Sequence, residues 1–229
     1  MNTASYVTDV VKRASKHVDQ VIVIDDGSED NTALLARRAG ALVVNHNVNL
    51  GYGGAIKSCI EEARSRNVDV LVILDGDRQH DPEEIPQVLA PILEGRADLA
   101  VGSRFITYKH NMPLYRRFGI KVINFLWNLG SRVKVSDTQS GFRAYNRAAL
   151  SNLSLSESGM SASIEILEDI RRSGLVIREV PISCVYGRSR PNAFAIKHGL
   201  AVAFSVGRIR IKAALSRSNP SESAVRHDS

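Results

Sequence analysis

The chain has 229 residues, of which 44% are hydrophobic and 24% charged, an ordinary globular composition that suffices for one domain with a full core. Its net charge of +6 and pI near 9.5 indicate an anionic partner, which nucleic acid, a phosphorylated small molecule or an acidic membrane surface would each satisfy. The isolated Cys59 and Cys184 exclude a zinc or disulfide framework and favour a reducing cytoplasmic setting. No apolar run reaches the roughly 18 residues of a membrane span, and the N-terminus lacks the layout of a signal peptide.

Short branched apolar runs alternate with helical patterns through the first half of the chain. This alternation predicts an α/β fold, a mostly parallel sheet with helices on both faces. Strands are expected at residues 21–24, 42–44, 70–74, 99–101, 176–180 and 183–186. Helices are expected at residues 32–39, 55–66 and 83–93. The irregular second half predicts a further region built on the same core.

Three later segments complete the domain prediction. Residues 114–129 predict an apolar helix, and we expect its aromatic and aliphatic side chains to pack in the core. The pattern of residues 193–215 predicts a basic amphipathic helix. This helix either lies on an anionic membrane surface or exposes its basic face to solvent, and both interpretations stay open. Residues 216–229 are polar and aperiodic, which predicts a disordered tail. We therefore expect a single domain over residues 1–215.

The third predicted strand ends in Asp75-Gly76-Asp77, which places two carboxylates where open α/β sheets bind ligands. A hard divalent cation such as Mg²⁺ needs few protein oxygens, because water and substrate phosphates complete its shell. Gln79 is a further candidate oxygen ligand. The alternative for an isolated Asp-x-Asp is a turn that only caps the helix beginning near Pro82.

The first predicted strand also ends in carboxylates, in the sequence Asp25-Asp26-Gly27-Ser28. A carboxylate here can accept hydrogen bonds from a nucleobase or from ribose hydroxyls. The same residues are also simple turn chemistry, with Asp30 or Asn31 as the cap of the next helix. The proximity of this strand to the Asp-x-Asp turn favours the ligand-binding interpretation.

Other segments carry groups that suit phosphates or nucleotides. Gly51 and Gly53 open a helix whose backbone amides could approach a nucleotide closely. The polar loop of residues 137–143 contains an acid and a base, and spacing alone leaves its role open. Arg188 and Arg190 stand in a glycine-containing segment suited to gripping phosphate oxygens, with a solvated basic loop as the alternative.

Taken in order, these motifs resemble those of family 2 glycosyltransferases, most of all the dolichyl-phosphate mannose and glucose synthase branch. The motifs are Asp25-Asp26-Gly27-Ser28, Asn49-x-Gly51-x-Gly53, Asp75-x-Asp77-x-Gln79-His80-x-Pro82, Gly102-Ser103-Arg104 and Asp137-x-x-Ser140-Gly141-Phe142-Arg143. The resemblance covers about residues 10–190 and implies a GT-A, Rossmann-like fold.

The resemblance also implies roles for these residues. The nucleotide-binding set would be Asp25, Asp26, Gly27, Ser28, Gly51, Gly53, Asp75 and Arg104. The ligands of Mg²⁺ or Mn²⁺ would be Asp75, Asp77 and Gln79. The catalytic set would be Asp77, Asp137, Arg143, Arg188 and Arg190, in which the two last arginines close over phosphates.

The implied reaction is metal-dependent, inverting transfer of a hexose from a UDP- or GDP-hexose to a polyprenyl or dolichyl phosphate. A phosphate monoester has its second pKa near ~6, so such an acceptor needs no dedicated base. Peripheral attachment to the cytoplasmic face of an anionic membrane is expected. Alternatives are transfer to a glycan hydroxyl, with Asp137 as base, and a catalytically impaired nucleotide-binding module. A nucleic-acid partner is not expected, because the basic residues are not interleaved with aromatic stacking platforms.

Relatives in this branch begin with a strand and a Pro-Ala-Tyr-Asn-Glu-Glu-like turn. This chain begins inside the helix that follows them, so the resemblance implies that the first strand is missing. A missing central strand would leave a sheet edge uncovered. We therefore expect reduced stability, or association as a homo-oligomer or with a membrane-protein partner.

Overall fold

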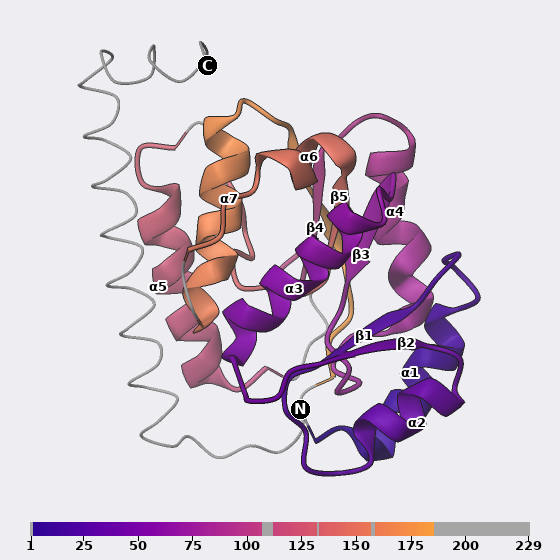
Figure 1. Ribbon diagram of the computed structural model, residues 1–229. Coiled ribbons are helices and arrows are strands. Elements are labelled where there is room, and N and C mark those ends of the chain that lie inside the picture. The colour runs from indigo at the N-terminus through magenta and orange to yellow at the C-terminus, as the bar shows by residue number, and fades with distance from the viewer. Residues whose placement is uncertain (1, 107–111, 132, 157–158, 186–229) are drawn as a thin grey trace.

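The computed structural model describes residues 2–106, 112–131, 133–156 and 159–185 (Figure 1). The helices are α1 (Ala4–Ala14), α2 (Thr32–Arg38), α3 (Gly51–Ser65), α4 (Ile85–Leu93), α5 (Leu114–Asn128), α6 (Arg147–Asn152) and α7 (Ala162–Arg172), with 3₁₀ turns η1 (Pro82–Glu84) and η2 (Gly159–Ser161). The strands are β1 (Ile22–Asp25), β2 (Leu42–Asn45), β3 (Val70–Ile73), β4 (Leu99–Ser103), β5 (Arg143–Asn146) and β6 (Ile177–Pro181).

The strands form two sheets. β1 and β2 pair in parallel, with Ile22 opposite Leu42. The larger sheet has the order β3-β5-β4-β6, in which β4 and β6 are parallel and β5 runs antiparallel to both β3 and β4. Three of its strands therefore share one direction. Among the described residues, β1 and β3 each pair along one edge only.

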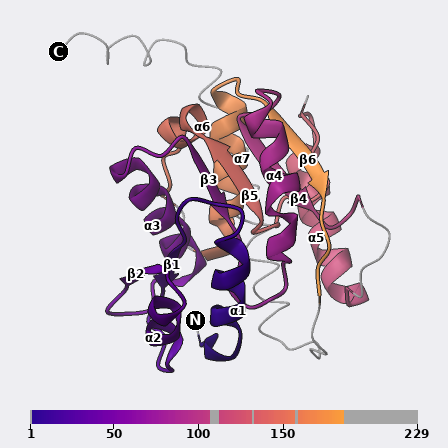
Figure 2. The ribbon, with the colours of Figure 1, turned by 90° about the vertical axis from the view of Figure 1, so that its right-hand side faces the viewer.

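Alternating side chains of the larger sheet enter two apolar clusters, as the period of two along a strand requires. Leu99 and Val101 of β4 face a cluster with α3, α5, α6 and α7, whereas Ala100 faces a cluster with α4 and the end of α1. Figure 2 shows α1 and α4 in front of the larger sheet and α7 behind it. This is the layered α/β architecture that the sequence predicts.

Helix α1 joins the two sheets and holds the turn after β3. Its Ala14 packs in the α4 cluster, while other residues of α1 pack with α2 beneath β1 and β2. Arg13 donates from Nε to Glu83 Oε1 over 3.2 Å and also pairs with Asp81. The Arg78 guanidinium Nε lies 3.5 Å from Asp9 Oδ2. These contacts fix the segment between β3 and α4 against α1.

Two expectations from sequence are wrong. The described part of the expected strand at residues 183–186 is not a strand, although the backbone amide of Val185 donates to Gln79 O over 2.9 Å. The expected core packing of residues 114–129 holds for Ile123 and Trp127 but not for Phe118 and Phe125, which are exposed. A helix that is apolar on two faces does not reveal by periodicity which face packs.

No helix in the described ranges is both long and apolar enough to cross a lipid bilayer. The expected amphipathic helix at residues 193–215 and the expected tail at residues 216–229 lie outside the described residues.

Candidate active site

Asp26 lies directly after β1 and ties three elements together. Its Oδ1 accepts from the Leu50 amide (2.8 Å) and lies 2.7 Å from His46 Nδ1, while its Oδ2 accepts from the Gly51 amide (2.9 Å). Those two amides open α3, so the carboxylate serves as the N-terminal cap that Leu50 itself does not supply. His46 Nε2 in turn lies 2.8 Å from Ser58 Oγ on α3.

The pKa of Asp26 follows from these contacts. Burial alone would raise it, but the hydrogen bonds from His46, Leu50 and Gly51 outweigh burial and lower the pKa below its ordinary value. Asp26 is thus held ionised among the residues predicted to bind the nucleotide. The α3 amides expected to approach a nucleotide are engaged by this carboxylate.

The turn after β1 requires a glycine at its second position, Gly27. Gly27 has a φ of +72°, and a Cβ there would lie 3.0 Å from the Asn49 amide nitrogen, so neither the conformation nor the space admits a side chain. Asp25 accepts from the backbone and side chain of Ser28 at Oδ1. Ser28 Oγ accepts from the Asn2 amide over 3.0 Å, which brings the start of the chain to this turn.

The remaining glycines of the predicted nucleotide set lie at the start of α3. Gly51 has a φ of +76° and open space where a Cβ would stand, and Gly53 is buried one half-turn further along the helix. α3 therefore begins at Gly51, four residues before the start expected from sequence.

The Asp75 carboxylate follows β3 and lies against the loop before β5. A Cβ built on Gly141 would come within 2.8 Å of Asp75 Oδ2. His80, which is buried, places Nδ1 3.6 Å from the same oxygen and packs its ring against Phe142. One side of Asp75 stays open, with 44% of its side-chain surface exposed. Desolvation by the surrounding protein, reinforced by the charge of Asp77, raises the pKa of Asp75.

Asp77 is oriented by the residue two positions further on. Its Oδ1 accepts from the Gln79 amide over 2.9 Å, and its Oδ2 accepts from the Gln79 side-chain amide. Arg78 between them adopts a φ of +64°, a left-handed conformation rare outside glycine. The tight turn thus directs both carboxylates of the Asp-x-Asp step, and Gln79 here holds Asp77 through its amide nitrogens.

These residues fit a hard divalent cation. Mg²⁺ and Mn²⁺ prefer carboxylate oxygen, and a desolvated carboxylate beside a second one is stabilised by a cation. In the part of the chain that the structure describes, no three His, Cys, Asp or Glu side chains form a metal centre. Asp75 and Asp77 therefore suit a cation that takes further oxygens from a bound diphosphate.

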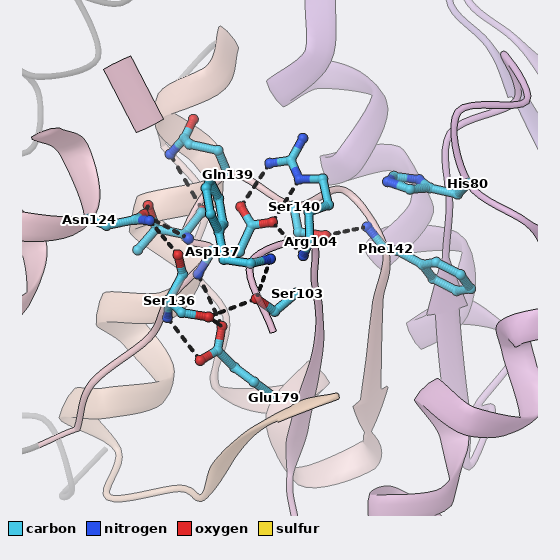
Figure 3. A network of polar contacts seen from close by, with 12 residues as sticks. His80, Ser103, Arg104, Asn124, Ser136, Asp137, Gln139, Ser140, Phe142 and Glu179 are labelled. Atoms are coloured by element: carbon cyan, nitrogen blue, oxygen red, sulfur yellow. Dashed lines mark hydrogen bonds and ion pairs between the residues drawn. The ribbon is translucent and has the colours of Figure 1, made fainter. Parts of the chain in front are cut away.

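Arg104 and Asp137 form a buried ion pair beside this turn (Figure 3). Arg104 Nε donates to Asp137 Oδ2 over 2.6 Å and Nη2 donates to Oδ1 over 2.7 Å, the two-pronged geometry that favours arginine. The Asp137 side chain is completely buried. The charge of Arg104 also lowers the pKa of Asp75, which opposes part of the desolvation and places this pair within electrostatic reach of the Asp-x-Asp turn.

Glu179 of β6 fixes the loop that carries Asp137 (Figure 3). It accepts from the Ser136 amide (2.8 Å), the Ser136 hydroxyl (2.9 Å) and the Asp137 amide (3.0 Å). Asn124 of α5 accepts from the amide and hydroxyl of Thr138 on the other side of the loop. The loop is thus clamped between β6 and α5.

Arg143 supports the same loop from behind. It is buried, and its guanidinium donates to the carbonyls of Thr138 (2.8 Å), Ser140 (2.9 Å) and Ser163 (3.1 Å). All three partners are backbone oxygens, so Arg143 shapes the loop through its main chain.

The structure thus gathers the predicted residues into two neighbouring groups. One surrounds Asp26 at the start of α3, and the other surrounds Asp75 between η1 and the loop before β5. Thr3 lies between the start of α2 and the Asp-x-Asp turn, since its amide donates to Thr32 Oγ1 and its hydroxyl is 4.0 Å from a Cβ built on Gly76. Arg188 and Arg190 lie outside the described residues.

His46 and Glu179 are not among the residues predicted from the sequence. Each is a single polar residue, 20 positions from Asp26 and 43 positions from Ser136 respectively, with no local spacing that reveals its partner. The only signal available was the pair of charged residues, Arg178 and Glu179, within a strand of otherwise apolar residues.

Comparison with known proteins matches this chain to one protein family. The sequence model of the family described as "Glycosyl transferase family 2" matches residues 1–154. A UDP-N-acetylglucosamine–dolichyl-phosphate N-acetylglucosaminyltransferase of Methanococcus voltae is 31% identical over 207 residues, spanning 81% of this chain and 82% of that protein. A polyprenol monophosphomannose synthase of Mycolicibacterium smegmatis is 31% identical over 174 residues, spanning 71% of this chain and 65% of that protein.

A solved structure shares the fold. Glucosyl-3-phosphoglycerate synthase from Mycobacterium tuberculosis, in complex with Mn²⁺ and UDP-glucose, superposes with a TM-score of 0.73 at 24% identity, over 91% of this chain and 76% of that one. The GT-A fold implied by the motifs is thereby confirmed. Together with the sequence match over more than half of its length, these findings show that the chain belongs to glycosyl transferase family 2, on the side of the dolichyl-phosphate sugar synthases.

Proposed function

We propose that this protein transfers a hexose, or a derivative such as N-acetylglucosamine, from a nucleotide sugar to a polyprenyl phosphate, with inversion and with a divalent cation. The observation that carries the proposal is the Asp75–Asp77 turn, which lies open to solvent on one side and against the Gly141 loop on the other. The relatives support the substrates, since one is named for dolichyl phosphate and another for a polyprenol product.

In this reaction an acceptor phosphate oxygen forms a bond to the anomeric carbon while the bond from that carbon to the diphosphate oxygen breaks. A cation held by Asp75 and Asp77 would neutralise the departing nucleoside diphosphate. Asp25 and Asp26 would hold the nucleoside side of the donor, on the rigid frame that Asp26 forms with α3. The protein's part is positioning and charge stabilisation.

The surroundings of Asp137 support a phosphate acceptor over a sugar hydroxyl. A hydroxyl acceptor needs a base, and Asp137 was the first candidate. Its carboxylate is completely buried and both oxygens accept from Arg104. A phosphate acceptor is already largely dianionic at pH 7 and requires no such group.

Arg188 and Arg190 are proposed to stabilise the departing diphosphate. They follow Val185 by three and five positions, and the Val185 amide is hydrogen-bonded to Gln79 O, beside the Asp-x-Asp turn. This attachment supports the proposal that the basic segment serves the same site. Peripheral attachment to the cytoplasmic face of a membrane is proposed because the acceptor is a lipid.

The test is transfer of labelled sugar from UDP-glucose, UDP-N-acetylglucosamine or GDP-mannose to a short polyprenyl phosphate, with Mn²⁺, with Mg²⁺ or with chelator. We expect metal-dependent label in the organic-solvent extract, of inverted anomeric configuration by NMR. The Asp77→Ala variant should lose transfer, whereas Asp69→Ala, a matched change at an exposed carboxylate near the start of β3, should keep it.

Three other outcomes would each contradict a part of this proposal. Label in a water-soluble glycan would replace the lipid acceptor by a hydroxyl acceptor. Metal-dependent nucleotide binding without transfer to either acceptor would support a non-catalytic module. Near-normal transfer by Asp77→Ala would remove the metal assignment.

A further inference from the structure

Helix α5 and the residue after it expose a continuous row of large apolar side chains. The row, called here the α5 stripe, consists of Leu114, Phe118, Val122, Phe125 and Leu129, which are between 38% and 79% exposed. Their spacing of three and four residues confines them to an arc of about 80° on the helix. The buried side chains Ile120, Ile123 and Trp127 lie on the opposite face. Figure 1 shows α5 at the left margin of the coloured ribbon.

The charged side chains of α5 itself are all positive. Arg117 and Lys121 are exposed, lie one helical turn apart and follow one border of the stripe. α5 contains no acidic residue. A large exposed apolar patch on a monomer marks an interaction surface, and its basic border selects a negatively charged one.

We propose that the α5 stripe docks onto an anionic membrane surface, with its apolar side chains at the boundary between headgroups and acyl chains and Arg117 and Lys121 on lipid phosphates. An apolar face with lysine and arginine at its border is the composition of helices that lie in the membrane interface. A second copy of the chain is a poorer partner, because an antiparallel symmetric contact would bring these cations toward their equivalents. The proposal goes beyond sugar transfer, since it assigns a surface that acts whatever the acceptor.

The same helix supports the candidate site from its inner side. Asn124 holds Thr138, and Asn128 exchanges hydrogen bonds with Val135, donating to its carbonyl over 2.8 Å and accepting from its amide over 2.9 Å. Docking through α5 would therefore place the loop that carries Asp137 directly behind the helix that contacts the lipid. This consequence, unlike the docking itself, rests on the proposed lipid acceptor.

The test is sedimentation of the full chain with vesicles of phosphatidylcholine mixed with phosphatidylglycerol, and with vesicles of phosphatidylcholine alone. We expect binding to the anionic vesicles that weakens with salt. The Phe118→Ser/Phe125→Ser variant should lower the partition coefficient at least about tenfold. The matched control Leu34→Ser/Leu93→Ser removes exposed leucines from α2 and α4 and should leave partitioning unchanged.

Two charge-reversal variants separate the effect of the basic border on vesicle binding from the effect of the chain's net charge. Arg117→Glu/Lys121→Glu should abolish the preference for anionic vesicles, whereas Lys12→Glu/Arg37→Glu, the same change of net charge on exposed positions of α1 and α2, should retain it. Sugar transfer is not measured here, so failure of the proposed reaction would leave the result intact.

Three results would overturn the proposal. The first is equal partitioning of the phenylalanine variant and its leucine control. The second is a wild-type dimer in sedimentation velocity that the phenylalanine variant converts to a monomer, which would assign the stripe to a second copy. The third is a lowered urea midpoint of that variant without vesicles, which would show that the chain itself covers the stripe.

Discussion

The Asp75 carboxylate rests directly on Gly141, so that a single added methyl group would stand 2.8 Å from Oδ2 and 3.0 Å from Oδ1. The contact joins the Asp-x-Asp turn after β3 to the loop before β5. Because the neighbouring atoms belong to a candidate metal ligand, we predict that Gly141→Ala displaces Asp75 and weakens metal-dependent nucleotide binding by about tenfold or more. Titration calorimetry with UDP or GDP and Mn²⁺ measures the change.

Gly119 of α5 provides the control for that substitution. A Cβ there meets nothing within 4 Å, and alanine is the better helix former, so Gly119→Ala should keep nucleotide binding and raise the free energy of unfolding by about 0.5–1 kcal/mol. Unchanged metal-dependent binding in Gly141→Ala would show that the position of Asp75 is not critical.

Asp26 predicts a pH-dependent contribution to stability. Its folded pKa is lowered, so the ionised carboxylate stabilises the fold above the unfolded value of about 3.9, and this contribution is lost as the pH falls through the folded pKa. Asp26→Asn should therefore lower the free energy of unfolding by about 1–3 kcal/mol at pH 7, and the difference from wild type should shrink below about pH 4. Urea denaturation across this range measures it.

The exposed Asp19, in the turn after α1, offers a matched carboxylate for comparison. Asp19→Asn should change stability by less than about 0.5 kcal/mol at either pH. A pH-independent deficit in Asp26→Asn would mean that packing of the amide, and not loss of the charge, is responsible.

We predict that substitutions at the buried pair of Arg104 and Asp137 have strongly non-additive effects on the free energy of unfolding. Asp137→Leu alone leaves a guanidinium that is 9% exposed without its carboxylate and should destabilise the fold by about 3–5 kcal/mol, as should Arg104→Met alone. The double variant removes both charges, so it should cost at least about 1 kcal/mol less than the sum. Additive losses in urea denaturation would show that the two side chains are not energetically coupled.

Much of the first half of the fold could be predicted because its local signals agree with its tertiary structure. The runs before Asp25 and Asp75 are short, branched and apolar, and β1 and β3 end within one residue of the predicted positions. η1 begins at Pro82, as expected from proline at a first helical position. Here propensity, turn chemistry and packing all favour one structure.

Strand β5 could not be predicted in this way. Its four residues, Arg143–Asn146, carry polar side chains at both ends and sit between β3 and β4 only because the sheet supplies partners on both edges. The same limit applies to α5, whose two apolar faces look alike in sequence until α7 and the sheet cover one of them. Long-range pairing, and not local pattern, determines both elements.

The chain is expected from its sequence to associate through an uncovered sheet edge, and the division of the strands into two sheets leaves such edges. β1 and β3 each have one unpaired edge within the described residues, and exposed edges invite strand addition. The expected association therefore remains a prediction. Sedimentation velocity over a range of protein concentrations, with the Phe118→Ser/Phe125→Ser variant as a comparison, separates edge pairing from contacts through the α5 stripe.

Thermal unfolding with nucleotides tests whether the two carboxylate groups form one pocket. Ligand at about 100 times its dissociation constant adds roughly 2.7 kcal/mol, which for a chain of this size raises the midpoint by about 5–11 °C. We predict such a shift with either UDP or GDP, and only when Mn²⁺ or Mg²⁺ is present, because the diphosphate must complete the shell of a cation held by Asp75 and Asp77. Asp77→Ala should abolish this shift, whereas Asp26→Asn should reduce it with metal present. A shift that survives in Asp77→Ala would mean that the nucleotide binds away from the Asp-x-Asp turn, and no shift with either nucleotide in a cooperatively unfolding protein would favour the non-catalytic alternative.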